Sequence, residues 1–316
     1  MPTPMISEQW PRHVLPIVRK EWYQKMLAVP SPILSLLGID TSRASVEYSQ
    51  GIGDFGLVPE YNSATAEGEP ASIPYDSFNP LYEKTFTHKE YAKGVAIERK
   101  LWDDDQRGNI RRRAANLGLS FGTTIANHAA SILNNAFSSS FLGGDGVALC
   151  HDAHPNRPSD TGTTFDNLGT TAFSYNAVVS TLQLGKRLTD DRGNPLPIIF
   201  DTLVVPIELE ASAYEVTNAI NKPTAAAAVN EANFVGSQGL RTLVDPYLTD
   251  SNNWFMVDSR QAAQHALWFW RVRPELTLDP ASDYNLVSRY RGYMRYSFGW
   301  DDWRWVFGHQ VTGGSA

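Results

Sequence analysis

The sequence has a single cysteine, Cys150, among its 316 residues. One thiol cannot close an internal disulfide, so a disulfide scaffold is excluded and the chain fits synthesis in a reducing cytoplasm. We expect Cys150 to be a plain buried side chain rather than a nucleophile. No run of about 18 apolar residues occurs, which argues against a transmembrane helix. The segment from Met1 to Trp10 lacks the basic start and apolar stretch of a secretory signal.

Positive charge is also scarce. The chain has 27 Lys and Arg residues against 34 Asp and Glu residues, a net charge of −7. A surface with this net charge does not favour tight binding of nucleic acid. It is compatible with a protein that encloses DNA without binding it tightly. Apolar residues make up 42% and charged residues 19%, which is a globular composition. The length allows one large domain or two of about 150 residues.

Common catalytic motifs are missing as well. There is no G-x-S-x-G elbow and no P-loop, and Gly51–Gly56 matches a dinucleotide-binding pattern in letters only, because no helical period follows. His151, Asp152 and His154 suggest a metal site by composition but lack the i, i+4 spacing of a helical zinc motif. We expect a structural role instead, with Asp152 binding backbone N–H groups in a turn closed by Pro155. We therefore predict no catalytic, cofactor or metal site; a metal-dependent hydrolase using these residues is the less favoured alternative.

Prolines punctuate the first part of the chain, at positions 2, 4, 11, 16, 30 and 32. They predict only short helical pieces there, such as Val18–Leu27. This pattern is compatible with an arm that lies over neighbouring subunits, but composition alone favours an ordinary flexible terminus.

The segment Arg43–Ile97 predicts an extended hairpin. One arm contains Val46–Tyr48, and the returning arm carries Tyr82, Phe86 and Tyr91. The polar connection between the arms has too few apolar residues to form a core of its own. It is either supported by another part of an assembly or a disordered loop.

The segment Asp103–Phe137 carries the strongest helical signal. Three aspartates at its start suit a helix N-terminus. Apolar residues recur every three or four positions, which predicts one apolar face formed by Ile110, Ala114, Leu117, Phe121, Ile125, Ala129, Ile132 and Ala136. Glycines 108, 118 and 122 predict a bend or close packing. We interpret Arg111, Arg112 and Arg113 as members of ion pairs, within or between subunits, rather than as DNA contacts.

The second half of the chain alternates between helices and strands. Ser174 caps a predicted helix Tyr175–Leu188 with Lys186 and Arg187 in its last turn. Asp190–Pro195 has turn composition, and Leu196–Val205 reads as a strand that Pro206 ends by opening a helix.

Further strands are predicted toward the C-terminus. They comprise Asn253–Asp258, and Tyr284–Phe298 with Trp303–Phe307 as a hairpin around Gly299–Asp302; Gln261–Trp270 is apolar enough for a strand or a helix. The aromatic residues here favour core packing or subunit contact over a stacking platform for single-stranded nucleic acid, because no lysines are interleaved with them: Trp268, Phe269, Trp270, Trp300, Trp303 and Trp305.

One ordered set of motifs carries a resemblance to a known family. His154-Pro155, a Gly-rich loop at 162–169, the helix Tyr175–Arg187, the turn Asp190–Leu196 and the segment Leu203–Ala211 follow one another. In this order they resemble the major capsid proteins of tailed bacteriophages with the Hong Kong 97 type fold, in particular the phage Mu-like major head subunits.

The resemblance implies an α+β fold with four parts. These are an N-terminal arm (1–42), an extended E-loop hairpin (43–98), a peripheral domain with a long spine helix (99–142 and 272–316), and an axial domain (143–271). It implies subunit contacts at Phe55, Tyr61, Tyr75, Arg111 and Arg112.

The function implied is a virion shell that assembles in the bacterial cytoplasm from hexamers and pentamers and encloses double-stranded DNA non-specifically. Portal, scaffolding and decoration proteins are the expected partners, and no membrane is involved. The first forty residues are too short for a large fused scaffolding segment, so we expect a separate scaffold or none. The alternative is an encapsulin-like compartment of the same fold, which would enclose protein cargo.

Overall fold

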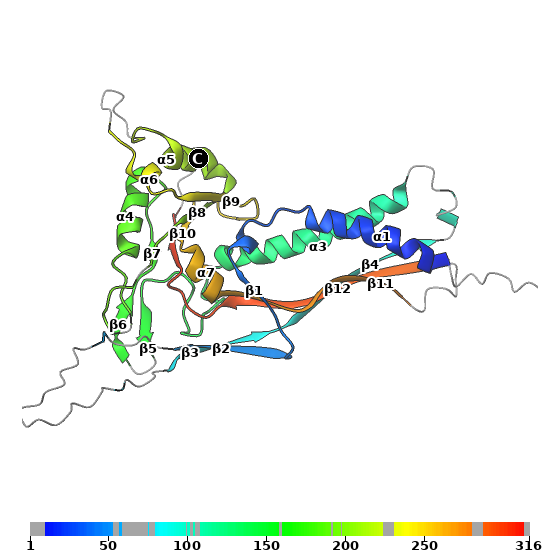
Figure 1. Ribbon diagram of the computed structural model, residues 1–316, viewed down its shortest axis with the longest axis horizontal. Coiled ribbons are helices and arrows are strands. Elements are labelled where there is room, and N and C mark those ends of the chain that lie inside the picture. The colour runs from blue at the N-terminus through cyan, green and yellow to red at the C-terminus, as the bar shows by residue number, and fades with distance from the viewer. Residues whose placement is uncertain are drawn as a thin grey trace, which may run out of the picture.

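The computed structural model describes residues 10–52, 57–58, 75, 80–98, 100–101, 104, 108–157, 160–190, 192–196, 198–223, 231–279 and 287–312. These residues form two lobes joined by a pair of long strands, with a hairpin projecting from the junction (Figure 1). We call the lobes the elongated lobe and the five-stranded lobe.

The elongated lobe is built on a four-stranded sheet in the order β1-β11-β12-β4. Its strands are β1 (Gly38–Thr41), β4 (Lys89–Glu98), β11 (Ala266–Leu278) and β12 (Val287–Trp300). β1 runs parallel to β11, whereas the β11–β12 and β12–β4 pairs are antiparallel. Helices α1 (Trp10–Leu27) and α3 (Asn109–Asn134) lie side by side along this sheet (Figure 1).

Helix α3 confirms the predicted apolar face. Its predicted apolar positions are all buried, and Ala136 just beyond the helix is buried too. The predicted start at the aspartates is wrong, because α3 begins at Asn109. Gly108 precedes it in the left-handed region, at φ 67°, a conformation that favours glycine.

Two glycines of α3 allow α1 to approach closely, as predicted. A Cβ at Gly118 would lie 2.2 Å from the carbonyl oxygen of Trp22, and one at Gly122 would lie 2.5 Å from that of Met26. Any side chain would therefore push the two backbones apart. Val18, Trp22 and Met26, one turn apart on α1, are buried.

Helix α1 corrects two expectations. It runs for 18 residues through Pro11 and Pro16, so the prediction of short pieces only is wrong. Pro11 lies in the first turn, where a missing N–H costs little, and the buried face from Val18 onward stabilises the rest. The alternative of a flexible terminus is also wrong for residues 15–37, because side chains of this segment are buried within the chain itself. Trp22 is 0% exposed within its own chain.

The five-stranded lobe contains a sheet in the order β7-β13-β10-β8-β9. The strands are β7 (Leu168–Gly169), β8 (Thr202–Val205), β9 (Arg241–Val244), β10 (Trp254–Val257) and β13 (Val306–His309); the helices are α4 (Tyr175–Gly185), η3 (Ile207–Leu209), α5 (Glu210–Asn218), α6 (Phe234–Ser237) and α7 (Ser259–His265). Every residue of β8, β10 and β13 is buried, so these central strands have no solvent face. A smaller pair, β5 (His154–Arg157) and β6 (Asp160–Phe165), lies beside this lobe.

Local signals in this lobe are mostly confirmed. Ser174 Oγ accepts from Ala177 N at 3.2 Å, and Asp190 Oδ1 accepts from two backbone N–H groups in the predicted turn. Helix α4 ends at Gly185, however, so Lys186 and Arg187 follow the helix rather than forming its last turn.

Three strand predictions need correction. The strand predicted over Leu196–Val205 begins only at Thr202. The segment Gln261–Trp270, predicted as a strand or a helix, contains both, because α7 is followed by β11 at Ala266. The predicted C-terminal hairpin is wrong, because β12 and β13 belong to different sheets.

The N-terminal hairpin is confirmed in part. β2 (Val46–Ile52) pairs antiparallel with β3 (Pro80–Thr87). The returning arm does not continue to Ile97 in this pairing, because β4 pairs with β12 instead. Within the described residues, no helix is long and apolar enough to cross a membrane.

We predict that Gly118→Ala destabilises the subunit. Alanine favours an isolated helix by about 1 kcal/mol, but the added Cβ meets the α1 backbone, and such overpacking costs on the order of 1–3 kcal/mol. Urea unfolding of the unassembled subunit measures this. The exposed position Asn127 on the same helix is the control, and Asn127→Ala should change stability by less than about 0.5 kcal/mol. Equal stability of Gly118→Ala and wild type would contradict the close α1–α3 contact.

Candidate assembly surfaces

The β2–β3 hairpin projects away from both sheets and carries exposed apolar side chains (Figure 1). Tyr48 on β2 is 67% exposed, and Tyr75, in the connection between the strands, is 92% exposed. Leu57 and Val58 are exposed as well. The predicted contact residues Phe55 and Tyr61 lie outside the described residues.

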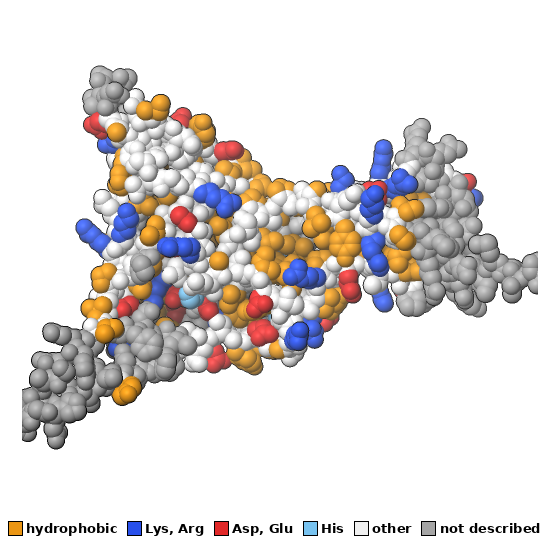
Figure 2. All heavy atoms as spheres, in the orientation of Figure 1, with side chains coloured by type: hydrophobic (Ala, Val, Ile, Leu, Met, Phe, Trp, Pro, Cys, Tyr) orange, Lys and Arg blue, Asp and Glu red, His pale blue; other side chains and the backbone are white. Residues whose placement is uncertain are grey.

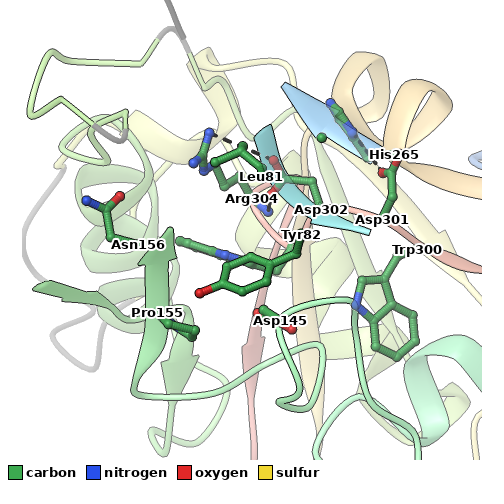
Figure 3. A pocket seen from close by; sticks show the side chains of 12 residues that line it. Leu81, Tyr82, Asp145, Pro155, Asn156, His265, Trp300, Asp301, Asp302 and Arg304 are labelled. Atoms are coloured by element: carbon green, nitrogen blue, oxygen red, sulfur yellow. Dashed lines mark hydrogen bonds and ion pairs between the residues drawn. The ribbon is translucent and has the colours of Figure 1, made fainter. Parts of the chain in front are cut away.

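The paired strands are held by both lobes, at the end next to their connection, around a small cavity of about 80 Å³ (Figure 3). Leu81 and Tyr82 come from β3, Asp145 from the loop after α3, His265 from the end of α7, and Asp301 from the segment after β12. We call this group the hairpin base. It makes the orientation of the hairpin depend on the junction of the two lobes.

Hydrogen bonds tie the hairpin base together. Ser49 Oγ donates to Asp301 Oδ2 at 2.5 Å, and Asp301 Oδ1 lies 3.0 Å from His265 Nδ1. On the other strand, Lys84 Nζ donates to the carbonyl oxygen of Leu142 at 2.5 Å. Burial lowers the pKa of Lys84, and the nearby charge of Asp145 opposes this change.

The imidazole of His265 is the side chain of this base whose ordinary pKa lies closest to neutral pH. Burial lowers its pKa, but the hydrogen bond to Asp301 and the charges of Asp302 and Asp301 outweigh burial and the repulsion from Arg304, so the net pKa is raised. The charged form of His265 is therefore favoured at the hairpin base.

The segment His151–His154 has a structural role. His154 is fully buried, with Nδ1 2.7 Å from Asp145 Oδ2 and Nε2 3.1 Å from Asn167 Oδ1, and its ring stacks on Trp303 at 4.4 Å. Asp152 is exposed. The predicted turn closed by Pro155 is wrong, because this proline lies in β5. In the described part of the chain, no group of three His, Cys, Asp or Glu residues is placed to hold a metal ion.

The remaining residues considered for chemistry belong to the core. Cys150 is buried, and burial raises the pKa of its thiol far above the ordinary range, which keeps it protonated and unreactive. The tryptophans considered for nucleic-acid stacking are also buried, which confirms core packing: Trp268, Trp270, Trp300, Trp303 and Trp305.

The arginines Arg111 and Arg112 are exposed near the start of α3. That end of α3 is the end of the elongated lobe farthest from the hairpin (Figure 1). The structure therefore places them away from β2 and β3. Their role in subunit contacts stays a prediction.

A surface that the sequence reading missed lies on the five-stranded lobe. A groove of about 650 Å³ runs between η3, α5 and β9, and is lined by Ile207, Glu208, Glu210, Ala211, Tyr214, Glu215, Thr242 and Val244. The sequence signal for this groove was the spacing of Ile207 and Tyr214. They lie seven positions apart, and so on one helical face, with acidic side chains around them.

A long helix laid along an extended sheet, a second lobe with its own sheet, and a projecting hairpin together define a capsid subunit of the Hong Kong 97 type fold. Solved structures bear this out. The chain is similar to the capsid of cyanophage P-SCSP1u, with a TM-score of 0.56 and 12% identity over 88% of this chain and 87% of that one. It is also similar to the capsid of an empty GTA particle, with a TM-score of 0.52 and 13% identity over 90% of each chain.

A virus-like particle from Pyrococcus furiosus shares the fold as well, with a TM-score of 0.53 and 10% identity over 93% of this chain and 97% of that one. The model of the phage capsid protein family matches residues 82–308, so the chain belongs to that family. No curated protein matches the sequence. Its role as a phage major capsid protein is structural rather than enzymatic. The narrower likeness to the Mu-like head subunits stays a prediction.

We predict a pH-dependent hairpin base. The pKa of His265 is higher in the folded state than its unfolded value of about 6.5. The stability that His265 contributes is therefore fully present below the unfolded pKa, and it is lost as pH rises through the folded pKa. Imidazole NMR titration should give a raised pKa for His265, and proteolysis of the hairpin should be faster at pH of about 8.5 than at about 5.5.

Asp301→Asn should lower the pKa of His265 and remove this pH dependence, whereas His151→Gln, outside the base, should leave both unchanged. A titration of His265 at its ordinary value in the wild-type protein would show that the Asp301 contact does not form.

Proposed function

We propose that this protein assembles into a closed icosahedral shell of hexamers and pentamers that encloses double-stranded phage DNA. The observation that carries the proposal is the β2–β3 hairpin. It leaves the body with Tyr48 and Tyr75 exposed. A two-stranded hairpin alone is marginally stable in water, so cover from another subunit would stabilise it.

The four parts implied by the resemblance are proposed as working domains: the N-terminal arm (1–42), the E-loop (43–98), the peripheral domain (99–142 and 272–316) and the axial domain (143–271). Burial of α1 on α3 supports an arm that is anchored to its own subunit before it reaches a neighbour. The net charge of −7 supports non-specific enclosure of DNA rather than tight binding. Assembly takes place in the host cytoplasm, with portal, scaffolding and decoration proteins as partners.

Electron microscopy of particles formed by the expressed protein tests the shell directly. Closed particles are expected, and particles from infected cells should contain DNA that resists nuclease. Protein cargo in place of DNA would favour the encapsulin-like alternative. A monomer that stays soluble at high concentration under all assembly conditions would contradict the proposal.

We predict that Tyr75→Ser reduces assembly without destabilising the subunit. Tyr75 is 92% exposed, so its loss leaves the isolated fold intact, but burying an aromatic ring at an interface contributes on the order of 2 kcal/mol. Particle yield by sedimentation measures the effect. Tyr75→Phe keeps the apolar ring and is the matched control, with wild-type yield expected. Unchanged assembly of Tyr75→Ser would remove Tyr75 from the contact.

A further inference from the structure

Two surfaces of opposite charge lie on the five-stranded lobe. The first, which we call the basic edge, consists of Leu184, Lys186 and Arg187 at the end of α4. The second, the acidic groove, is formed by Ile207, Glu208, Glu210, Tyr214 and Glu215 with β9 as its floor. In Figure 2, Lys and Arg side chains gather over α4 at the left edge of this lobe, and Asp and Glu side chains lie over α5 at its top.

The basic edge is available for contact. Lys186 and Arg187 are exposed, and no ion pair joins either side chain to another described residue. Leu184 is 48% exposed beside them. The edge therefore combines two cations with an apolar side chain that its own subunit leaves half uncovered.

The acidic groove has the complementary composition. Its three glutamates are exposed, and Tyr214 is 67% exposed among them. No salt bridge joins a glutamate of the groove to another residue in the described part of the chain. Lys222 pairs with Glu231 at 3.2 Å, and Arg241 points to the face of β9 opposite Thr242 and Val244, which line the groove. The groove thus holds negative charge that its own lobe does not neutralise.

One subunit cannot join these two surfaces. Helix α4 packs on β13, where the Thr181 hydroxyl lies 2.8 Å from His309 Nε2, whereas the groove lies along β9, which is separated from β13 by β10 and β8. A second copy placed beside the first would bring its basic edge to this groove. Because the two surfaces differ, the contact is heterologous, and repeating it generates a ring if the rotation closes.

We infer that the basic edge of one subunit docks into the acidic groove of the next copy of this chain. The inference rests on the proposed shell and names a contact within its rings. Burial of Leu184 against Ile207 and Tyr214 supplies the apolar part of the contact. The charges at its rim set the pairing of unlike surfaces and speed association more than they add affinity. Assembly through this contact weakens as salt rises, because exposed charges are screened.

Charge reversal tests the pairing. The edge variant carries Lys186→Glu and Arg187→Glu, and the groove variant carries Glu208→Lys and Glu210→Lys. Each places like charges across the contact, so each should reduce the rate of particle formation at low salt by about tenfold or more. The variant that carries all four substitutions restores opposite charges and should recover most of the rate. Lys20→Glu with Lys25→Glu, exposed on α1, makes the same change in net charge as the edge variant and should assemble like wild type.

The outcomes separate this contact from the shell itself. Normal assembly of either reversed variant, or failure of the fourfold variant to recover while its subunit unfolds at the wild-type temperature, would overturn the inference and leave the shell standing. No particles from wild type would overturn the shell.

A second measurement does not depend on charge. With Leu184→Cys and Tyr214→Cys in one chain, a bis-maleimide should link assembled subunits into ladders. Cys150 is buried and does not compete. Particles that yield no ladder would also count against the contact.

Discussion

The pairing of β11 with β12 is the constraint on which the rest of the molecule depends. The two strands, 13 and 14 residues long, stay paired from Ala266 opposite Trp300 to Leu278 opposite Tyr290. At the Ala266 end, α7 leads into β11 and β12 continues toward β13, so both strands are rooted in the five-stranded lobe. Their other ends support the far part of the elongated lobe. Because both strands of this ladder continue into the five-stranded lobe, the ladder links the two lobes through two chain connections.

The helices add a second layer to this frame, and glycines let it pack tightly. A Cβ at Gly292 of β12 would lie 2.6 Å from the ring of Phe121 on α3, and the same ring lies 5.3 Å from that of Trp22 on α1. Helix α3 therefore approaches the sheet at a glycine of β12 and approaches α1 at its own Gly118 and Gly122. A further tie joins the lobes, since the backbone N–H of Ile33 donates to Asp245 after β9 at 3.3 Å. The body of the subunit is thus held together by contacts within its own chain.

The sequence was sufficient where a structure depends on residues close along the chain. The apolar spacing of α3, the Ser174 cap and the Asp190 turn each involve neighbours within a few positions. The sequence was insufficient where contacts between residues far apart along the chain determine the structure. Helix α1 continues through Pro16 because α3 offers a surface for it, and β4 leaves the hairpin because β12 offers hydrogen bonds. Exposure of Tyr75 followed from its polar surroundings, whereas the acidic groove required β9 to lie beside α5, which no local pattern encodes.

This division between a buried body and exposed surfaces is consistent with a subunit that assembles with copies of itself. The core residues fold in the single chain, so folding does not wait for neighbours, while the hairpin and the groove leave apolar side chains exposed with charges around them. Each such contact is worth only a few kcal/mol, too little to hold two subunits alone but enough when every subunit makes several. Because each contact is weak, a misplaced subunit can dissociate again. A subunit in a closed shell makes all of these contacts together. The charge on each surface then selects which edge meets which groove.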